Sequence, residues 1–87
     1  MSLQHKTKQV KLTYILSRKA FVDGFNSIRK HLPFDYDSCD KDLRYGWGYE
    51  RGRILALVYD GPLKEGRHVT HGAIVAYLKA HNEGLVL

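Results

Sequence analysis

The sequence is short of the residues on which several kinds of protein function depend. It has one cysteine, Cys39, so it cannot form an internal disulfide or a multi-cysteine zinc site. Its longest apolar run, residues 54–59, falls far below the roughly 20 residues of a membrane-spanning helix. No apolar segment follows the lysines near the start of the chain, so we expect no secretory signal and no membrane association. These absences indicate a cytoplasmic protein, since a lone cysteine suits a reducing compartment.

The cluster of aspartates in the middle of the chain lacks the pattern of a calcium loop. Asp35, Asp37, Asp40 and Asp42 alternate with other residues, as the ligands of an EF-hand do. That loop needs a glycine at its sixth position and a glutamate at its twelfth, where this chain has Asp40 and Gly46. We therefore expect these aspartates to cap helices and to face solvent.

The histidines and the cysteine also lack the partners that chemistry requires. His68 and His71 have the spacing of two metal ligands, with His81 further on, but no cysteine or carboxylate completes the set. Four aspartates near Cys39 would raise the pKa of its thiol by like-charge repulsion, which makes it a poor nucleophile. The glycines at 46, 48 and 52 have the wrong spacing for a dinucleotide fingerprint. We expect no metal ion, no cofactor and no enzymatic activity.

The 87 residues are enough for one domain. Apolar residues make up 44% of the chain and charged residues 26%, which is typical of a folded protein. Residues 1–8 are polar and contain Lys6 and Lys8, so we expect them to form a flexible basic arm on a single domain spanning 1–87.

Positive charge is concentrated at the start of the chain. The formal net charge is +5, and no acidic residue precedes Asp23. From Val22 onward the charges sum to zero. Clustered cations attract phosphate backbones by releasing bound counterions. The stretch before Asp23 carries Lys6, Lys8, Lys11, Arg18 and Lys19, and we predict that these residues contact nucleic acid.

The first element after the arm is predicted to be a short strand over residues 9–16. Val10, Leu12 and Tyr14 alternate with polar residues, the period of a half-buried strand. The alternative is an extended segment that pairs only with a partner protein.

A helix is predicted over residues 18–32, with Ser17 as its N-cap and Pro33 ending it. Its outer face would carry Arg29 and Lys30, two further candidate phosphate contacts. The apolar residues with helical spacing are Phe21, Phe25, Ile28 and Leu32.

A second helix is predicted from an N-cap at Asp40 to Tyr59. Arg44 and Arg51 lie two turns apart on one side of it and complete the candidate phosphate contacts. A row of small residues would line another side and admit a close neighbour, namely Gly48, Gly52 and Ala56. The apolar stripe predicted to face the core is Leu43, Trp47, Ile54, Leu57 and Val58. The alternative is a loop to Arg51 followed by a strand over 53–59.

The last helix is predicted over residues 71–82, capped by Thr70 and followed by Gly84 as the C′ residue. Its apolar face would hold Ile74, Tyr77, Leu78 and His81. A turn at 60–62 and a polar loop at 64–68 precede it, and residues 85–87 form an apolar tail. The pattern as a whole predicts a mainly α domain of three helices with a short N-terminal strand, and a small α+β domain as the alternative.

Gly24-Phe25, Pro33-Phe34 and Gly46-Trp47 follow one another along the chain. Together these pairs resemble the ribosome modulation factor family and its small phage and prophage relatives. Leu43 stands where that family has the first of two tryptophans, and the resemblance covers roughly residues 20–58. It implies a helix–loop–helix unit that associates with ribosomal RNA, and no catalytic residue is carried over.

Two functions are therefore expected for this chain. The first is a small basic module that binds RNA, the ribosome or another nucleic acid through its N-terminal arm. The second is a phage-type modulator that docks on a host protein, or on a second copy of itself, through the tail at 85–87 or a free strand at 9–16.

Overall fold

The computed structural model describes residues 12–84 and has five helices and one small hairpin in that range. The predicted mainly α class is confirmed. The arm at 1–8 and the tail at 85–87 lie outside the described residues. The elements in order are α1 (Leu12–Ser17), α2 (Lys19–Arg29), α3 (Tyr36–Lys41), α4 (Leu43–Val58), β1 (Lys64–Glu65), β2 (His68–Val69) and α5 (His71–Asn82).

The predicted strand over residues 9–16 is wrong where the structure describes it, because α1 occupies Leu12–Ser17. Leu16 is fully buried, and Leu12 and Ile15 pack against the core beside it. These three residues lie at helical spacing, which places them on one side of α1. The sequence alternation ends at the exposed Tyr14, so the burial of Leu12, Ile15 and Leu16 favours a helix over a strand.

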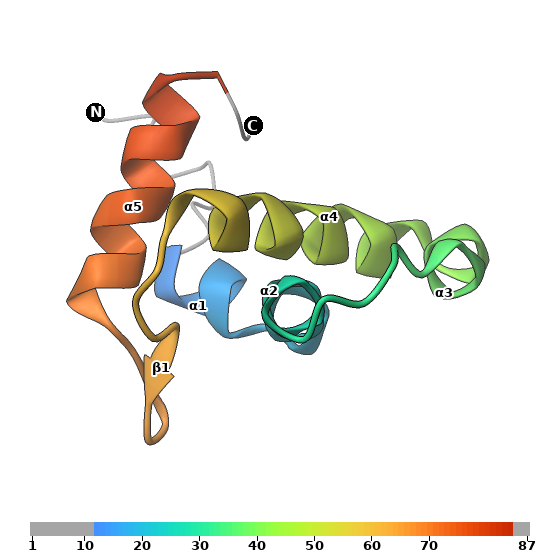
Figure 1. Ribbon diagram of the computed structural model, residues 1–87, viewed down its shortest axis with the longest axis horizontal. Coiled ribbons are helices and arrows are strands. Elements are labelled where there is room, and N and C mark those ends of the chain that lie inside the picture. Colours follow the sequence, from blue (N-terminus) through green and yellow to red (C-terminus); the bar gives the residue numbers. More distant parts are fainter. Residues whose placement is uncertain (1–11, 85–87) are drawn as a thin grey trace, which may run out of the picture.

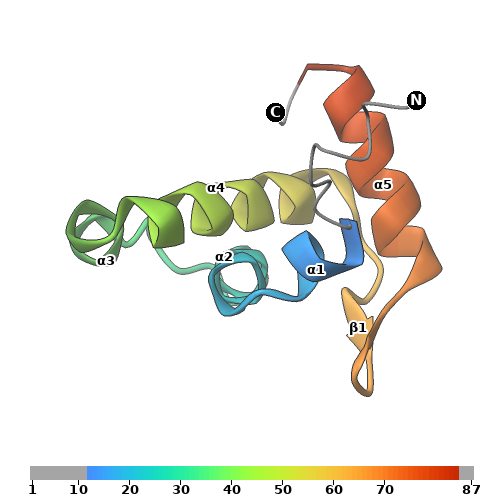
Figure 2. The same cartoon turned by 180° about the vertical axis from the view of Figure 1, so that it is seen from behind.

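The domain is organised around the crossing of α2 and α4. Figure 1 shows α4 running across the view with α2 seen nearly end-on beneath it, so the two helices cross at a steep angle. The helix α5 stands at the far end of α4, and α3 lies at its beginning. Figure 2 shows α1 on the same side of α4 as α2.

Small residues bring the backbones of α2 and α4 together. A Cβ atom added to Gly52 would collide with the carbonyl oxygen of Phe21, and one added to Gly24 would collide with the carbonyl oxygen of Tyr49. At Gly48 an added Cβ would lie 3.1 Å from the Cβ of Ala20. The predicted row of small residues on α4 therefore does admit a close neighbour, and that neighbour is α2.

Large side chains fill the core on either side of this crossing. Leu16, Phe21 and Leu55 are fully buried. The ring of Phe21 meets the ring of Tyr77 from α5 edge-on, with centroids 5.8 Å apart. Tyr77 is therefore part of the predicted inner face of α5, whereas Leu78 is about half exposed.

Helix α2 ends one turn earlier than predicted, in a Schellman motif. His31 has a φ of 59°, and the N–H of Leu32 donates to the carbonyl of Ser27 while that of His31 donates to Ile28. The proline at 33 disfavours helical geometry at Leu32. Leu32 therefore leaves the apolar stripe and is exposed.

The predicted second helix is two helices, because the chain breaks at Asp42. The side chain of Asp42 accepts hydrogen bonds from the N–H groups of Arg44 and Tyr45 and caps α4. Asp35 caps α3 in the same way through the N–H of Ser38. The predicted N-cap at Asp40 is wrong, and the alternative strand over 53–59 is also wrong, since α4 continues to Val58.

The C-terminal part follows the prediction closely. The Oγ1 of Thr70 accepts from the N–H of Ala73 and caps α5, and Gly84 has a φ of 79° directly after the C-cap. The predicted polar loop at 64–68 contains the two short antiparallel strands β1 and β2. Gly66, with a φ of 64°, takes the first position of the two-residue turn between them.

Candidate nucleic-acid interface

Three of the predicted cations gather around one shallow pocket. Arg18 and Lys19 come from the start of α2, and Arg44 comes from the start of α4. The pocket has a volume of about 360 Å³ and is lined in addition by Ala20, Asp42 and Tyr45. The close crossing of α2 and α4 is what brings these two helix starts together.

The two helix starts differ in how they are capped. Asp42 caps α4, so the carboxylate that lines the pocket is engaged with two backbone N–H groups. In the described part of the chain no side chain caps α2. The predicted N-cap Ser17 belongs to α1 instead, where its hydroxyl donates to the carbonyl of Tyr14.

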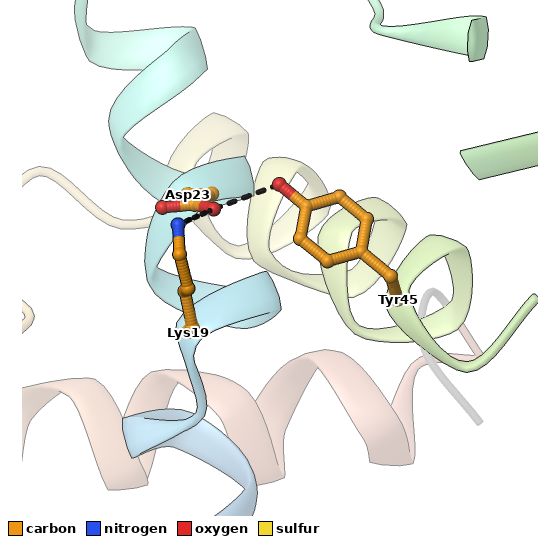
Figure 3. Close-up of polar contacts among 3 residues, drawn as sticks. All are labelled: Lys19, Asp23 and Tyr45. Atoms are coloured by element: carbon orange, nitrogen blue, oxygen red, sulfur yellow. Dashed lines mark hydrogen bonds and ion pairs between the residues drawn. The ribbon is translucent and has the colours of Figure 1, made fainter. Parts of the chain in front are cut away.

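A polar contact beside the pocket fastens α2 to α4. The carboxylate of Asp23 accepts a hydrogen bond from the Nζ of Lys19 at 2.8 Å and another from the hydroxyl of Tyr45 at 2.7 Å (Figure 3). Figure 3 shows Lys19 approaching Asp23 along α2 while the ring of Tyr45 reaches across from α4. Lys19 therefore compensates the charge of Asp23, and the neutral hydroxyl of Tyr45 adds a second hydrogen bond to the same carboxylate oxygen.

The same contact shifts the pKa values of its members. Partial burial would raise the pKa of Asp23, but the hydrogen bonds from Lys19 and Tyr45 and the charges of Lys19 and Lys30 outweigh it and lower the pKa. Burial, followed by the hydrogen bond to Asp23, raises the pKa of the Tyr45 hydroxyl. Asp23 therefore remains ionised and Tyr45 remains neutral across the physiological range.

The basic surface extends from Arg18 toward the hairpin. The guanidinium carbon of Arg18 lies 5.8 Å from the centre of the Tyr14 ring, which is 58% exposed. Tyr14 in turn lines a second shallow pocket, of about 310 Å³, with Arg67 and His68. We call this surface the basic strip, defined by Arg67, Tyr14, Arg18, Lys19 and Arg44.

Sequence reasoning missed Tyr14 and Arg67 as parts of this surface. Tyr14 was assigned to a strand, and Arg67 lies in a loop far along the chain from Arg18. The signal available in the sequence was Gly66 within the polar stretch 64–68, because a glycine between two polar residues is typical of a tight hairpin turn and Arg67 follows it.

The other predicted cations that the structure describes, Arg29, Lys30 and Arg51, line neither of these two pockets. Lys6, Lys8 and Lys11 lie outside the described residues. Lys30 is exposed and lines a different pocket, beside Asp23 and Asp35.

Arg29 and Arg51 have contacts within the fold. The Nη2 of Arg29 donates to the carbonyls of Tyr59 and Gly61 at 2.6 and 2.8 Å, which ties α2 to the loop after α4. The guanidinium of Arg51 lies 4.2 Å from the centre of the Trp47 ring, and its side chain is 11% exposed. Both residues therefore stabilise the fold, and their predicted phosphate contacts are not supported by these positions.

The remaining candidate chemistry has no assembled site in the described residues. Within 12–84 no group of three or more histidine, cysteine, aspartate or glutamate side chains is placed to hold a metal ion. Burial, with Asp35, Asp40 and Glu50 nearby, raises the pKa of the Cys39 thiol. No helix in this range has the length and apolar character needed to cross a membrane.

No protein-family model, no curated protein and no solved structure matches the chain. The resemblance to the ribosome modulation factor family therefore stays a prediction. A function for the chain has to be argued from its own residues.

Proposed function

We propose that this protein is a small non-enzymatic module that binds single-stranded RNA, such as an exposed segment of ribosomal RNA, along the basic strip. The observation that carries the proposal is the position of Arg18. Its side chain lines the pocket shared with Lys19 and Arg44 and also lies against the exposed ring of Tyr14. One residue thus connects a phosphate-binding pocket to an aromatic surface.

The combination of an exposed aromatic ring and flanking cations favours a single strand. Unpaired bases stack on tyrosine rings, while arginines hold the phosphates on either side. Arg18 lies over the ring of Tyr14, and Arg67 lines the same pocket as Tyr14. A duplex would offer only its phosphates to the same surface.

The N-terminal arm supports the proposal through its place in the sequence. Lys6, Lys8 and Lys11 come directly before α1, the helix that carries Tyr14. Three cations thus precede the basic strip along the chain and add to its attraction for a phosphate backbone. A cytoplasmic location is part of the proposal, because RNA is present there and the thiol of Cys39 would stay reduced.

A salt-titrated binding assay with single-stranded RNA, duplex RNA and duplex DNA tests this function. Each phosphate contact with a single strand contributes about 0.7 to the slope of log affinity against log salt. We expect Arg18→Ala and Arg67→Ala each to lower the slope by about that amount, and Lys79→Ala on α5 to leave it unchanged. Equal slopes for Arg18→Ala and Lys79→Ala would contradict the proposal.

Tyr14 variants separate base stacking from charge. Loss of one stacked base costs about 1–3 kcal/mol, so Tyr14→Ala should weaken RNA binding at every salt concentration. The salt slope should not change, because no phosphate contact is removed. Tyr14→Phe keeps the ring and should bind RNA as the native chain does. Full binding by Tyr14→Ala would show that the strip holds phosphates only.

A second candidate function is docking on another protein. The observation that favours it is the apolar outer side of α4, where Leu43 and Leu57 are 82% and 70% exposed. Exposed apolar surface of this kind marks protein–protein contacts. A host protein is one candidate partner for this surface.

A further inference from the structure

A shallow pocket lies between α1 and the hairpin, and no acidic side chain lines it. The helix α1 contacts β2, and the pocket of about 310 Å³ is lined by residues of both elements and of the turn before β2. This volume is at the lower end of the range for small-ligand pockets. We call it the hairpin pocket, defined by Thr13, Tyr14, Ser17, Arg67, His68 and Val69.

The hairpin pocket differs in charge from the pockets at the crossing of α2 and α4. Asp42 lines one of those pockets and Asp23 lines another. In the hairpin pocket the cationic or basic side chains are Arg67 and His68, and both are exposed. Glu65 pairs with His68 across the hairpin but does not line the pocket. An anion in the hairpin pocket would therefore meet no negative charge on its lining.

The polar side chains of the hairpin pocket are available to a ligand. Within residues 12–84, the side chains of Thr13, Arg67 and His68 make no hydrogen bond and no ion pair. Arg29, by contrast, donates to two carbonyls of its own chain. A hydroxyl, a guanidinium and an imidazole can each donate to a phosphate oxygen. The pocket thus offers three free donors, one from α1 and two from the hairpin.

Three donors suit the three free oxygens of a phosphate monoester. Such a group ends a nucleotide chain, and it carries a charge of about −1.5 to −2 at neutral pH. A phosphate inside a strand has one fewer free oxygen and carries about one charge. The guanidinium of Arg18, 5.8 Å from the centre of the Tyr14 ring, adds a further cation beside the pocket. A terminal phosphate therefore gains more from this pocket than an internal one.

Tyr14 provides a surface for the base next to that phosphate. It lines the hairpin pocket and is 58% exposed. Unpaired bases stack on tyrosine rings that solvent can reach. A nucleotide whose phosphate is held by Arg67 and His68 can place its base on this ring, so one pocket can bind both parts of a terminal nucleotide.

We infer that the hairpin pocket binds the terminal phosphate monoester of a nucleotide chain, with the terminal base on Tyr14. For an RNA ligand the inference rests on the proposed function and deepens it, because the basic strip then binds the end of a strand. The remaining nucleotides would continue toward Arg18, Lys19 and Arg44. A 5′-phosphate, a 3′-phosphate and a free mononucleotide share this chemistry, and the experiments below distinguish them.

One short single-stranded RNA prepared with different ends tests the inference. The three forms carry a 5′-phosphate, a 3′-phosphate or hydroxyl groups at both ends. At a fixed salt concentration, one phosphorylated form should bind the native chain about tenfold more tightly than the hydroxyl form, the effect of one charge-assisted hydrogen bond. The form that gains affinity identifies which end of the strand enters the pocket. Equal affinities for all three forms would overturn the inference and leave RNA binding by the basic strip intact.

Variants of the hairpin show whether this pocket is the cause of the preference. The double variant Arg67→Ala/His68→Ala should bind all three forms equally. Lys64→Ala is the matched control, because it removes one cation from the same hairpin but from a different pocket, and it should keep the preference. Circular dichroism melts show that both variants are folded. A native preference in the double variant would place the phosphate elsewhere and overturn the inference.

Free nucleotides separate this inference from the RNA proposal. Equilibrium dialysis of the full chain against adenosine and its 5′- and 3′-monophosphates uses no RNA. The native chain should retain a monophosphate in preference to adenosine, and the double variant should not. If this result is obtained and no RNA form binds, the RNA function fails and the pocket stands as a mononucleotide site. Equal retention of the monophosphates and adenosine, together with equal RNA affinities, would overturn the inference.

Discussion

The side of α4 that faces α2, its inner face, and the opposite side, its outer face, differ in composition and in burial. The inner face holds small residues and is buried against α2, where Gly52 lies against the backbone of Phe21. The outer face holds Leu43, Trp47 and Leu57, and it is exposed. Apolar residues thus occur on both sides of this helix, and the side that holds the glycines is the one buried against α2.

The difference shows that close approach of backbones can decide how a helix is oriented. A helix that crosses another at contact distance needs a side without Cβ atoms, and α4 has only one such side. Leu55, beside the glycines, is fully buried. Leu43 and Leu57 on the opposite side stay exposed, because α2 can cover only one side of α4.

The largest effect on stability is expected from a substitution that adds a side chain to the glycine side of α4. Gly52→Ala puts a Cβ against the Phe21 carbonyl and 2.9 Å from the N–H nitrogen of Phe25, two backbone groups that cannot move separately. We expect a loss of about 3 kcal/mol or more in the free energy of unfolding, enough to unfold much of so small a domain. Urea titration measures this loss.

Gly46→Ala is the matched control, because the added Cβ would lie 3.1 Å from the Cβ of Cys39 and no closer than 3.4 Å to its backbone. Alanine also gains about 1 kcal/mol of helix propensity over glycine. We expect the stability of Gly46→Ala to stay within about 1 kcal/mol of the native value. Equal losses for the two glycine variants would show that backbone contact is not the reason for the orientation of α4.

The next largest difference in stability is expected between alanine variants of two leucines in α4. Leu55→Ala removes a fully buried side chain and should cost about 3 kcal/mol. Leu57→Ala, two residues further, removes an exposed side chain and should change stability by less than about 0.5 kcal/mol in dilute protein. Thermal or urea unfolding of both variants checks this contrast. A larger loss of stability in Leu57→Ala than in Leu55→Ala would mean that α4 is rotated about its own axis.

A smaller effect is expected at the contact between Asp23 and Tyr45. Tyr45→Phe removes a hydrogen bond across the two helices and should cost about 1 kcal/mol at neutral pH. The pKa of Asp23 is below its ordinary value of 3.8, so its contribution is present above that value and is lost as the pH falls through the lower, folded pKa. Unfolding midpoints at neutral and acidic pH should therefore differ less in Tyr45→Phe than in the native chain. An unchanged difference would contradict this role for Tyr45.

Local signals predicted the elements that depend on local chemistry. Thr70 caps α5 and Gly84 follows it, because a hydroxyl N-cap and a glycine with positive φ act within one turn. The row of small residues on α4 was also recognised. Trp47 was predicted to be in the core and is partly exposed, because hydrophobicity alone does not show which side of a helix its neighbour occupies.

The candidate site could be predicted only in part for a similar reason. Arg18, Lys19 and Arg44 were each proposed from charge, and the crossing of α2 and α4 brings them together. Arg29 shows the limit of charge as a signal, because it binds the carbonyls of Tyr59 and Gly61. Contacts of that kind join residues far apart in the sequence, so no pattern within a short stretch of sequence predicts them.

Fluorescence of Trp47, the only tryptophan, tests the orientation of α4 most directly. The measurement uses the folded native chain in dilute solution, with acrylamide as the quencher. We predict that acrylamide quenches the emission readily, because Trp47 is 39% exposed. Emission that stays shielded from acrylamide in the folded chain would place Trp47 in the core and contradict this arrangement of α4.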